Sequence, residues 1–240
     1  MVDAGEGFVR YGPERLSVEQ MRERMTALES TMAGRRSVRH FSSDSVPMDV
    51  LESAIRIASS APSGAHKQPW TFCIVTDPVL KARIREEAER EELASYTGRM
   101  SDRWLADIKF TGTDHIKPFI EEAPALIIIF KRIYERVEKP GATTDAAPNE
   151  IVKAPNYYVP ESVGIAAGFL LVALQHAGLA ALTHTPSPMN FLGKLLGRPE
   201  NERAFLNIPV GWPAEDAEVP IIRRKLMAEV LVKYPELKVE

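Results

Sequence analysis

The sequence predicts one domain in which helices cover a β-sheet, of the α+β or α/β class. Three observations support this prediction. Short apolar runs typical of strands alternate with longer helical patterns. The chain has 240 residues, 45% of them hydrophobic, which is enough for one sizeable core. The segment from Ser162 is apolar on every side, and a helix without a polar face needs neighbours all around it.

Two helices and a turn-rich connection are expected in the first quarter of the chain. Ser17 and Gln20 have the spacing of a capping box, and apolar residues then recur every three or four positions as far as Gly34. A second helix has Pro47 in its first turn. Its buried face is expected to contain Val50, Leu51, Ala54, Ile55 and Ala58. The sequence "SSAPSGAHKQP" ends this helix and leads into a strand at 71–76.

The rest of the chain is expected to alternate strands with helices inside the single domain 1–240. The predicted order is a charged helix from about Pro78 to Tyr96, a less regular segment to Glu122, a strand at 125–130, a long loop at about 132–160, the apolar helix from Ser162, a strand near 179–185, a short helix near 191–197 and a strand near 204–211. An N-terminal extension at 1–16 and a C-terminal arm at about 220–240 flank these elements. A loop as long as 132–160 is usually functional or disordered.

The apolar helix from Ser162 admits two arrangements. It can lie at the centre of a monomer, or it can contribute to a subunit interface. Gly164 and Gly168 would allow another backbone to approach closely.

Composition gives little indication of nucleic acid or an anionic membrane as a partner. The 30 Lys and Arg residues balance 33 Asp and Glu residues, for a net charge of −3. The N-terminus has no basic start followed by an apolar stretch, so we expect a cytoplasmic protein. The single cysteine, Cys73, lies in an apolar run and is expected to be a buried thiol. The five histidines lack metal-ligand spacing, so we expect no metal site.

The signatures of serine hydrolases, phosphate-loop enzymes, zinc proteases and dinucleotide-binding folds are missing from the sequence. Two clusters of cationic residues remain. Arg35, Arg36 and Arg39 surround Ser37, and a second cluster covers 223–225. Guanidinium groups bind phosphate oxygens in pairs, so the two clusters could converge on one phosphate. The alternative is that the first cluster offsets a helix dipole and the second is solvated.

Glu92 and Tyr96 are four positions apart and would share one face of a helix. Lys117 follows in the next segment. Taken alone, Glu92 sits in "REEAEREE", where charged residues normally form weak solvated pairs. The residues themselves leave both interpretations open.

Eight stretches of the sequence resemble, in order and rough spacing, the iodotyrosine deiodinase family of the nitroreductase superfamily. They are "RRSVRHFS", "APSGAHKQPWTF", "EELASYTGRMSDRW", "APALIIIFK", "LLVALQHAGLAALTHTP", "LLGRP", "PVGWP" and "VPIIRRK". The resemblance covers nearly the whole chain from about Phe8. The sequence "RRSVR" specifies only the superfamily, whereas "APSGAH" and the set of Glu92, Tyr96 and Lys117 are more specific.

The resemblance implies an α+β fold with a central, mainly antiparallel sheet flanked by helices, in an intertwined homodimer with one FMN in each of two interface sites. The implied cofactor-binding residues are Arg35, Arg36, Ser37, Val38, Arg39, Ser63, Thr183, His184, Thr185 and Arg224. Thr185 is the implied catalytic residue, because its hydroxyl would hydrogen-bond flavin N5 and favour the transfer of electrons one at a time.

The implied reaction is the FMN-dependent reductive dehalogenation of halogenated tyrosines. Glu92 would bind the substrate ammonium, Lys117 its carboxylate, Tyr96 would hydrogen-bond beside them, and the N–H of Ala65 would bind the phenolate. Residues of about 90–120 would form a lid. The electron donor would be NAD(P)H or a separate flavin reductase. Two alternatives are a broad-specificity nitroreductase or quinone reductase and a non-catalytic flavin-binding protein.

The sequence also departs from the animal members of the family. The segment at about 132–160 is longer, and His184 replaces a threonine between Thr183 and Thr185. We also expect no membrane anchor of the kind that the animal members have. His184 could shift the flavin potential or the substrate's ionisation, or it could simply lie at the surface.

Overall fold

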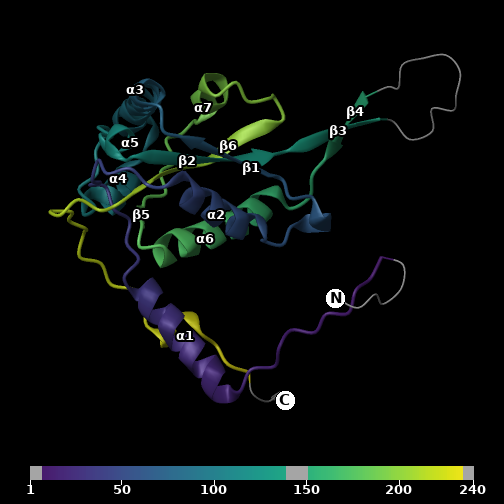
Figure 1. The fold of residues 1–240 in the computed structure, drawn as a ribbon. Helices are drawn as coiled ribbons and strands as arrows, with labels where there is room; N and C mark the ends of the chain where they lie inside the picture. The colour runs from purple at the N-terminus through teal and green to yellow at the C-terminus, as the bar shows by residue number, and fades with distance from the viewer. Residues whose placement is uncertain (1–6, 139–150, 235–240) are drawn as a thin grey trace, which may run out of the picture.

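The computed structural model describes residues 7–138 and 151–234, and it places helices on both faces of a four-stranded sheet (Figure 1). The elements in chain order are α1 (Val18–Ala33), α2 (Met48–Ser59), η1 (Gly64–His66), β1 (Trp70–Val75), α3 (Pro78–Ala94), η2 (Ser95–Arg99), α4 (Asp102–Lys109), α5 (Phe119–Glu122), β2 (Ala125–Arg132), β3 (Tyr134–Glu138), β4 (Ile151–Pro155), α6 (Val159–His176), β5 (Ala180–Ala181), α7 (Asn190–Leu195), β6 (Glu202–Gly211) and α8 (Met227–Val230). The label η1 marks a 3₁₀ turn and η2 a π-helical turn.

The main sheet has the strand order β1-β2-β6-β5, and each neighbouring pair is antiparallel. In the middle of the sheet Ile128 of β2 lies opposite Cys73 of β1 and Asn207 of β6. The antiparallel sheet confirms the α+β class.

Side chains of β2 separate two core layers, because successive residues of a strand point to opposite faces of the sheet. Ile127 and Ile129 pack in the layer that contains α2 and α6. Leu126, Ile128 and Phe130 pack in the layer that contains α3, α5 and α7. The sheet is therefore buried on both faces, and β2 has only apolar residues from Ala125 to Phe130.

Local signals in the sequence account for several helix boundaries. Ser17 and Gln20 form the predicted capping box at the start of α1. Pro47 occupies the N-cap of α2, whose buried residues include Leu51 and Ala54. The carboxylate of Asp77 accepts a hydrogen bond from the N–H of Leu80 at 2.7 Å and so caps α3.

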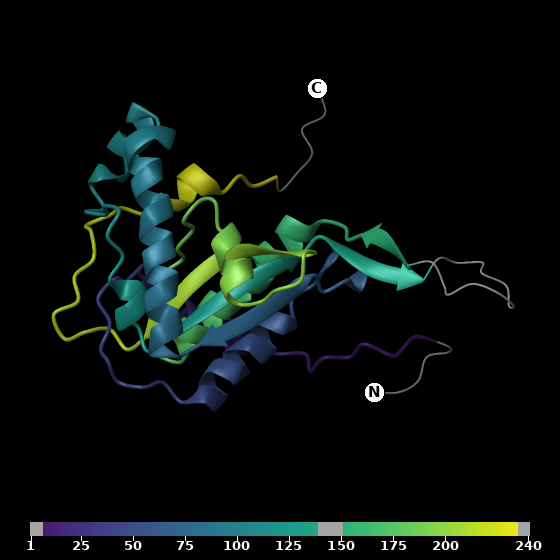
Figure 2. The ribbon, with the colours of Figure 1, turned by 90° about the horizontal axis from the view of Figure 1, so that it is seen from above.

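The expectation of a long loop at about 132–160 is wrong for the described residues. Strands β3 and β4 pair as an antiparallel hairpin that projects beyond the main sheet (Figure 2). The pairing begins at Tyr134 and Pro155, and α6 already starts at Val159. Alternating side chains let a half-exposed ribbon form in a segment that lacks a long apolar run. Residues 139–150 of the predicted loop lie outside the described residues.

Three further expectations need correction. The strand predicted near 179–185 is only the two residues of β5, followed by an isolated bridge from His184 to Asn207. The segment expected to be irregular up to Glu122 contains α4 and α5. Cys73 is half-buried rather than fully buried, although burial still raises the pKa of its thiol.

The apolar helix α6 is covered on one side only. Its buried side packs on α2 and β2, whereas Ile165, Phe169 and Val172 are exposed together with Gly164 and Gly168. Among the described residues, α6 is the one helix long and apolar enough to cross a membrane, a property that core helices share. An exposed apolar face of this kind indicates a partner surface.

Helix α1 projects from the body of the molecule and buries none of its residues (Figure 1). Val18, Met21, Met25 and Leu28 are all exposed. The C-terminal arm returns to the end of this helix, where Arg224 donates to the carbonyl oxygens of Ala33 and Arg35. The two chain ends thus present a second exposed apolar surface.

We expect Gly211→Ala to lower the free energy of unfolding by about 1–3 kcal/mol. A Cβ atom at Gly211 would lie 2.4 Å from Cδ of Pro124, and neither the proline ring nor the strand can move freely. The control is Gly193→Ala inside α7, where a Cβ meets nothing within 4 Å. Urea unfolding at one protein concentration measures both, and equal midpoints would contradict the prediction.

Candidate active site

Three ionisable side chains meet in the core layer between α3 and the sheet edge. One oxygen of the Glu92 carboxylate lies 3.6 Å from Nζ of Lys117, and the other lies 3.4 Å from Nε2 of His184. All three residues are buried: the exposed fraction is 8% for Glu92, 3% for Lys117 and 7% for His184. Buried charges are rare in proteins unless they are paired, so this cluster is a candidate site.

Helix α3 positions Glu92 on its buried side. The buried residues of this helix are Lys81, Ile84, Ala88 and Glu92, which follow one another at intervals of three or four positions. Glu92 therefore continues the stripe that faces the core, one turn beyond Ala88. The interpretation of Glu92 as part of a solvated charge pair is wrong.

Lys117 comes from the segment that precedes α5, and the protein satisfies its ammonium group from several directions. Besides Glu92, Nζ donates to Oγ1 of Thr113 at 3.1 Å and to the carbonyl oxygen of Asp114. The backbone N–H of Lys117 donates to Glu89 of α3 at 2.7 Å, which ties the segment to the helix. Nothing in the sequence marked Thr113 or Asp114 as part of the site.

Tyr96 lies in the π-helical turn that follows α3, a type of turn often found at functional sites. Its hydroxyl donates to the carbonyl oxygen of Thr113 at 3.2 Å, and Nζ of Lys117 lies 5.6 Å from the centre of its ring. The structure thus brings together Glu92, Tyr96 and Lys117, the three residues that the family resemblance implied.

His184 is buried, so a role for it at the surface is excluded. Its backbone pairs with Asn207 of β6. The ring of Phe119 packs edge to face against the imidazole, and the two ring centres are 5.2 Å apart. Neither ring nitrogen has a hydrogen-bond partner in the described structure, and the same holds for the side-chain amide of Asn207. Asn207 was missed by the sequence analysis, although a single polar residue in the apolar run "AFLNIPVG" marks it.

The cluster shifts the pKa values of its members. Burial would raise the pKa of Glu92, but the nearby His184 and Lys117 outweigh burial and lower it. Burial lowers the pKa of the Lys117 ammonium, an effect that Glu92 opposes. Burial also raises the pKa of the Tyr96 phenol. Glu92 and Lys117 lie at ion-pair distance beside a phenol whose pKa is raised.

Glu92 also borders a cavity of about 100 Å³ that contains Thr185 in its wall. The other lining residues are Ser95, Arg99, Met100, Trp104 and Ser187. Thr183 and Thr185 are exposed, whereas His184 between them is buried. This alternation presents both predicted hydroxyls to the outside of the sheet edge and the imidazole to the core.

The first arginine cluster lines a neighbouring cavity of about 170 Å³. Arg35, Arg36, Ser37 and Arg39 contribute to its wall, together with Phe110, Thr111, Pro220 and Ile222. Val38 is buried behind them, and its N–H donates to the carbonyl oxygen of Ala181. Arg36 donates to the carbonyl oxygen of Pro220, and Arg224 is held at the end of α1, so the second cluster lies next to the first.

The predicted turn at 63–65 is strained. Ala65, His66 and Gln68 all have positive φ angles, which non-glycine residues rarely adopt. The N–H of Gln68 donates to Oγ of Ser63 at 2.9 Å, and the N–H of Gly64 donates to Oγ of Ser162 at 3.2 Å. Ala65 is exposed at this turn. Strain of this kind is often found at ligand-binding positions.

The structure does not bring this turn to the other predicted residues. The turn follows α2 and precedes β1, on the side of the hairpin, while α3 and α4 lie at the opposite end of the sheet in both views (Figures 1 and 2). Its contacts are with Tyr157, Tyr158 and Ser162, next to the start of α6. One chain therefore holds the predicted site residues in two separate groups.

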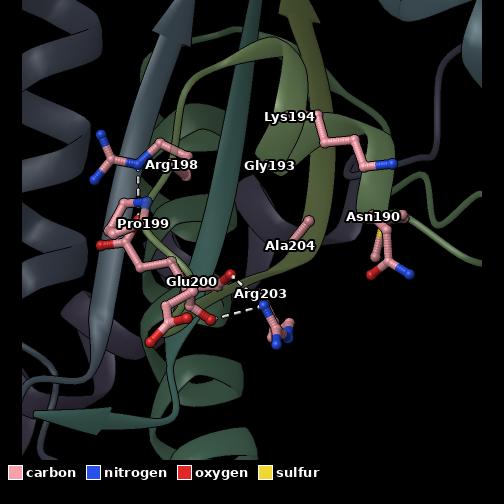
Figure 3. A pocket seen from close by; sticks show the side chains of 10 residues that line it. Asn190, Gly193, Lys194, Arg198, Pro199, Glu200, Arg203 and Ala204 are labelled. Carbon is pink, nitrogen blue, oxygen red and sulfur yellow. Dashed lines mark hydrogen bonds and ion pairs between the residues drawn. The ribbon is translucent and has the colours of Figure 1, made fainter.

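A larger cavity of about 470 Å³ between α7 and β6 lies apart from both groups. Its cationic side chains Lys194, Arg198 and Arg203 point in different directions, as Figure 3 shows. Arg198 binds the buried carboxylate of Glu202 at 2.7 Å. Size alone does not make this cavity the candidate site, because its cations do not converge.

Comparisons with known proteins identify relatives over most of the chain. The model of the Nitroreductase family matches residues 32–212. The iodotyrosine deiodinase of Haliscomenobacter hydrossis is 52% identical over 227 residues, which cover 95% of this chain and 97% of that protein. Iodotyrosine deiodinase 1 of Mus musculus is 41% identical over 225 residues, which cover 93% of this chain and 75% of that protein.

Two solved structures have the same fold. A crystal structure of oxidized iodotyrosine deiodinase bound to FMN and 3-iodo-L-tyrosine matches with a TM-score of 0.67 at 32% identity, covering 88% of this chain and 100% of that chain. The FMN-dependent nitroreductase NfnB from Mycobacterium smegmatis in complex with NADPH matches with a TM-score of 0.63 at 20% identity, covering 87% of this chain and 98% of that one. The second match is a likeness of fold alone.

We expect Lys117→Met to lower the free energy of unfolding by about 3–5 kcal/mol, because it leaves the Glu92 carboxylate buried without its cation. The double variant with Glu92→Gln should be more stable than the sum of the two single effects, by at least about 1 kcal/mol. Urea unfolding of the four proteins measures this coupling.

The control is the exposed pair of Arg103 and Asp107 on α4, whose atoms lie 3.9 Å apart. Its coupling energy should be close to zero, because solvent screens the two charges. An equally small coupling between Glu92 and Lys117 would mean that their pairing has no energetic role.

Proposed function

This chain belongs to the nitroreductase family and groups with its iodotyrosine deiodinases, and from that premise we propose that it catalyses the FMN-dependent reductive dehalogenation of halogenated tyrosines. The observation that carries the proposal is the buried pair of Glu92 and Lys117 beside Tyr96, with Glu92 in the wall of a cavity that Thr185 also lines. A nitroreductase needs a flavin site but has no need of a buried, oppositely charged pair.

The residues around the first arginine cluster fit FMN. Three arginines and Ser37 line one cavity, and guanidinium and hydroxyl groups are a donor set suited to a phosphate monoester. We assign Arg35, Arg36, Ser37, Val38 and Arg39 to this end of FMN, with Arg224 next to them. Ser63, Thr183, His184 and Thr185 would contact the flavin ring region. FMN supplies the electrons of the reaction when it is bound and reduced.

The charged cluster suits the zwitterionic end of an amino acid. The carboxylate of Glu92 would bind the substrate ammonium, and Lys117 would bind the substrate carboxylate. When substrate binds, Glu92 would exchange the Lys117 ammonium for the substrate ammonium, and Lys117 would exchange the Glu92 carboxylate for the substrate carboxylate. No buried charge would then be left without a partner. Tyr96 donates to Thr113 now and lies close enough to Lys117 to line the same end of the substrate. The segment at about 90–120 would close over the substrate as a lid.

The turn at 63–65 suits the opposite end of the substrate. The N–H of Ala65 would donate to the phenolate oxygen, and the strained backbone fixes its direction. Ser63 already accepts from Gln68, so its hydroxyl proton remains available to a cofactor. In the reaction the carbon–halogen bond breaks, halide leaves, and a carbon–hydrogen bond forms with two electrons and one proton. NAD(P)H or a separate flavin reductase would supply the electrons.

The proposed site needs a second copy of the chain. The turn at 63–65 and the charged cluster lie at opposite ends of one sheet, so the two groups would meet across a homodimer interface (Figure 1). The exposed apolar faces of α6 and α1 are the surfaces that we assign to this interface. A cytoplasmic location stays a prediction.

The anaerobic FMN-loaded protein, reduced with dithionite, should convert 3-iodotyrosine to tyrosine and iodide over many turnovers. Glu92→Gln should weaken the binding of 3-iodotyrosine roughly 10- to 100-fold, because it removes one charge-assisted pair. Product chromatography and a binding titration measure the two effects.

The matched control is Glu86→Gln on the exposed side of the same helix, which should bind and react normally. Reduction of a nitroaromatic by NAD(P)H without any tyrosine release would favour a nitroreductase. Bound flavin that cannot be reduced and reoxidised repeatedly would favour a non-catalytic flavin-binding protein.

We expect Phe169→Glu to dissociate the dimer and to lower the FMN content, because it places a charge in the exposed apolar face of α6. Light scattering and flavin absorbance measure the mass and the cofactor. The control is Val79→Glu at an exposed position of α3. A dimer with full FMN content in the Phe169 variant would contradict the assigned interface.

A further inference from the structure

The imidazole of His184 lies against the carboxylate that we assign to the substrate ammonium. The proposed function assigns His184 to the flavin region but gives its imidazole no task at Glu92. Its Nε2 atom is 3.4 Å from Oε1 of Glu92. Both ring nitrogens are buried and have no hydrogen-bond partner in the described structure. Buried polar groups normally have partners, so this ring needs an explanation.

The surroundings of His184 fix the ring in place. Its backbone and that of Asn207 exchange two hydrogen bonds, of 2.8 and 3.0 Å, so the two side chains point to the same face of the sheet. Asn207 is fully buried, and its amide atoms are also without partners in the described part of the chain. Phe119 packs edge to face against the ring. The imidazole thus lies on the same face of the sheet as the Asn207 amide, with Nε2 3.4 Å from the Glu92 carboxylate.

The charged groups that face His184 come from three elements. Glu92 belongs to α3, Lys117 to the segment before α5, and Arg39 to the segment after α1. Burial lowers the pKa of His184, Glu92 opposes this effect, and the positive charges of Lys117 and Arg39 add to it. The ring is therefore neutral at pH 7, and it titrates below the ordinary histidine value of 6.5.

We propose that His184 is a positioning residue that sets the lower pH limit for amino-acid binding, because its protonated ring competes with the substrate ammonium for the carboxylate of Glu92. This inference rests on the proposed function, since it takes Glu92 as the ligand of that ammonium.

A count of the buried charges gives the direction of the effect. With a neutral ring, Glu92, Lys117 and a zwitterion together have no net charge. A proton on His184 leaves one positive charge in excess and places it next to the bound ammonium. In the free protein no substrate ammonium is present, so the proton on His184 faces the Glu92 carboxylate without a competing positive charge from the substrate. The ring therefore binds its proton more weakly when substrate is bound, and substrate binds more weakly at low pH.

The test is the dissociation constant of 3-iodotyrosine from the oxidized FMN-loaded protein, measured between pH 5 and 7.5. As the pH falls below the pKa of His184, the wild-type dissociation constant should increase, with a slope that approaches roughly tenfold per pH unit. His184→Gln keeps a polar side chain without a titratable proton, so its constant should stay nearly flat. His40→Gln, at an exposed histidine, should follow the wild-type curve. Ratios of variant to wild type cancel the ionisation of the free substrate.

The outcomes separate this inference from the proposed function. Binding at pH 7 with equal slopes in wild type and His184→Gln would overturn the inference alone. Absence of binding at every pH would overturn the proposed function and the inference with it. A wild-type affinity that increases at low pH would also overturn the inference, because the predicted competition has the opposite sign.

A second measurement does not depend on substrate. The folded pKa of His184 is below its unfolded value, so the unfolded chain binds more protons and stability is lost as the pH falls below about 6.5. Urea midpoints between pH 5 and 7 should therefore fall less steeply for His184→Gln than for the wild type. Equal slopes would show that folding leaves the pKa of His184 unchanged, so the ring would not experience the burial and charges described above, and this outcome would overturn the proposal.

Discussion

A carboxylate can be buried in a protein only if opposite charges or hydrogen-bond donors reach it, and Glu92 imposes this requirement on the whole region around the site. Its place on the core side of α3 follows from the same spacing that buries Ile84 and Ala88. Lys117 therefore has to approach from the segment before α5, and that segment is anchored to α3 through Glu89. The carbonyl groups of Thr113 and Asp114 then become partners of Tyr96 and Lys117.

The second constraint is the incomplete cover of the apolar helix. Helix α6 fills the core layer beneath the sheet with one side and exposes Ile165, Phe169 and Val172 on the other. The same helix supports the strained turn through Ser162, whose hydroxyl accepts from Gly64. The exposed face and the turn that contains Ala65 are therefore parts of one substructure, so contacts made by α6 bear directly on the geometry of the turn.

Much of the fold could be predicted from the sequence, because local signals such as the Ser17 capping box and the apolar run of β2 are strong. The hairpin β3-β4 could not, since its residues alternate too weakly to be distinguished from a loop. Among the site residues, Glu92 was detectable by helical spacing, because it follows Lys81, Ile84 and Ala88 at intervals of three or four positions. The burial of His184 and its contact with Glu92 depend on how a short edge strand meets a distant helix, and no local pattern contains that information. The roles of the site residues stay predictions.

The division of the candidate site between two ends of the sheet has a genetic consequence. Suppose that each complete site takes its turn at 63–65 from one copy and its charged cluster from the other. In a mixed dimer, a defect in the turn and a defect in the cluster then affect sites according to which copy supplies each group. A chain damaged near Gly64 and a chain damaged near Glu92, expressed together, would form mixed dimers in which one site combines both defects and the other combines both intact halves. Two inactive alleles would then complement each other within a single assembly, and activity would not be inherited as a property of one chain.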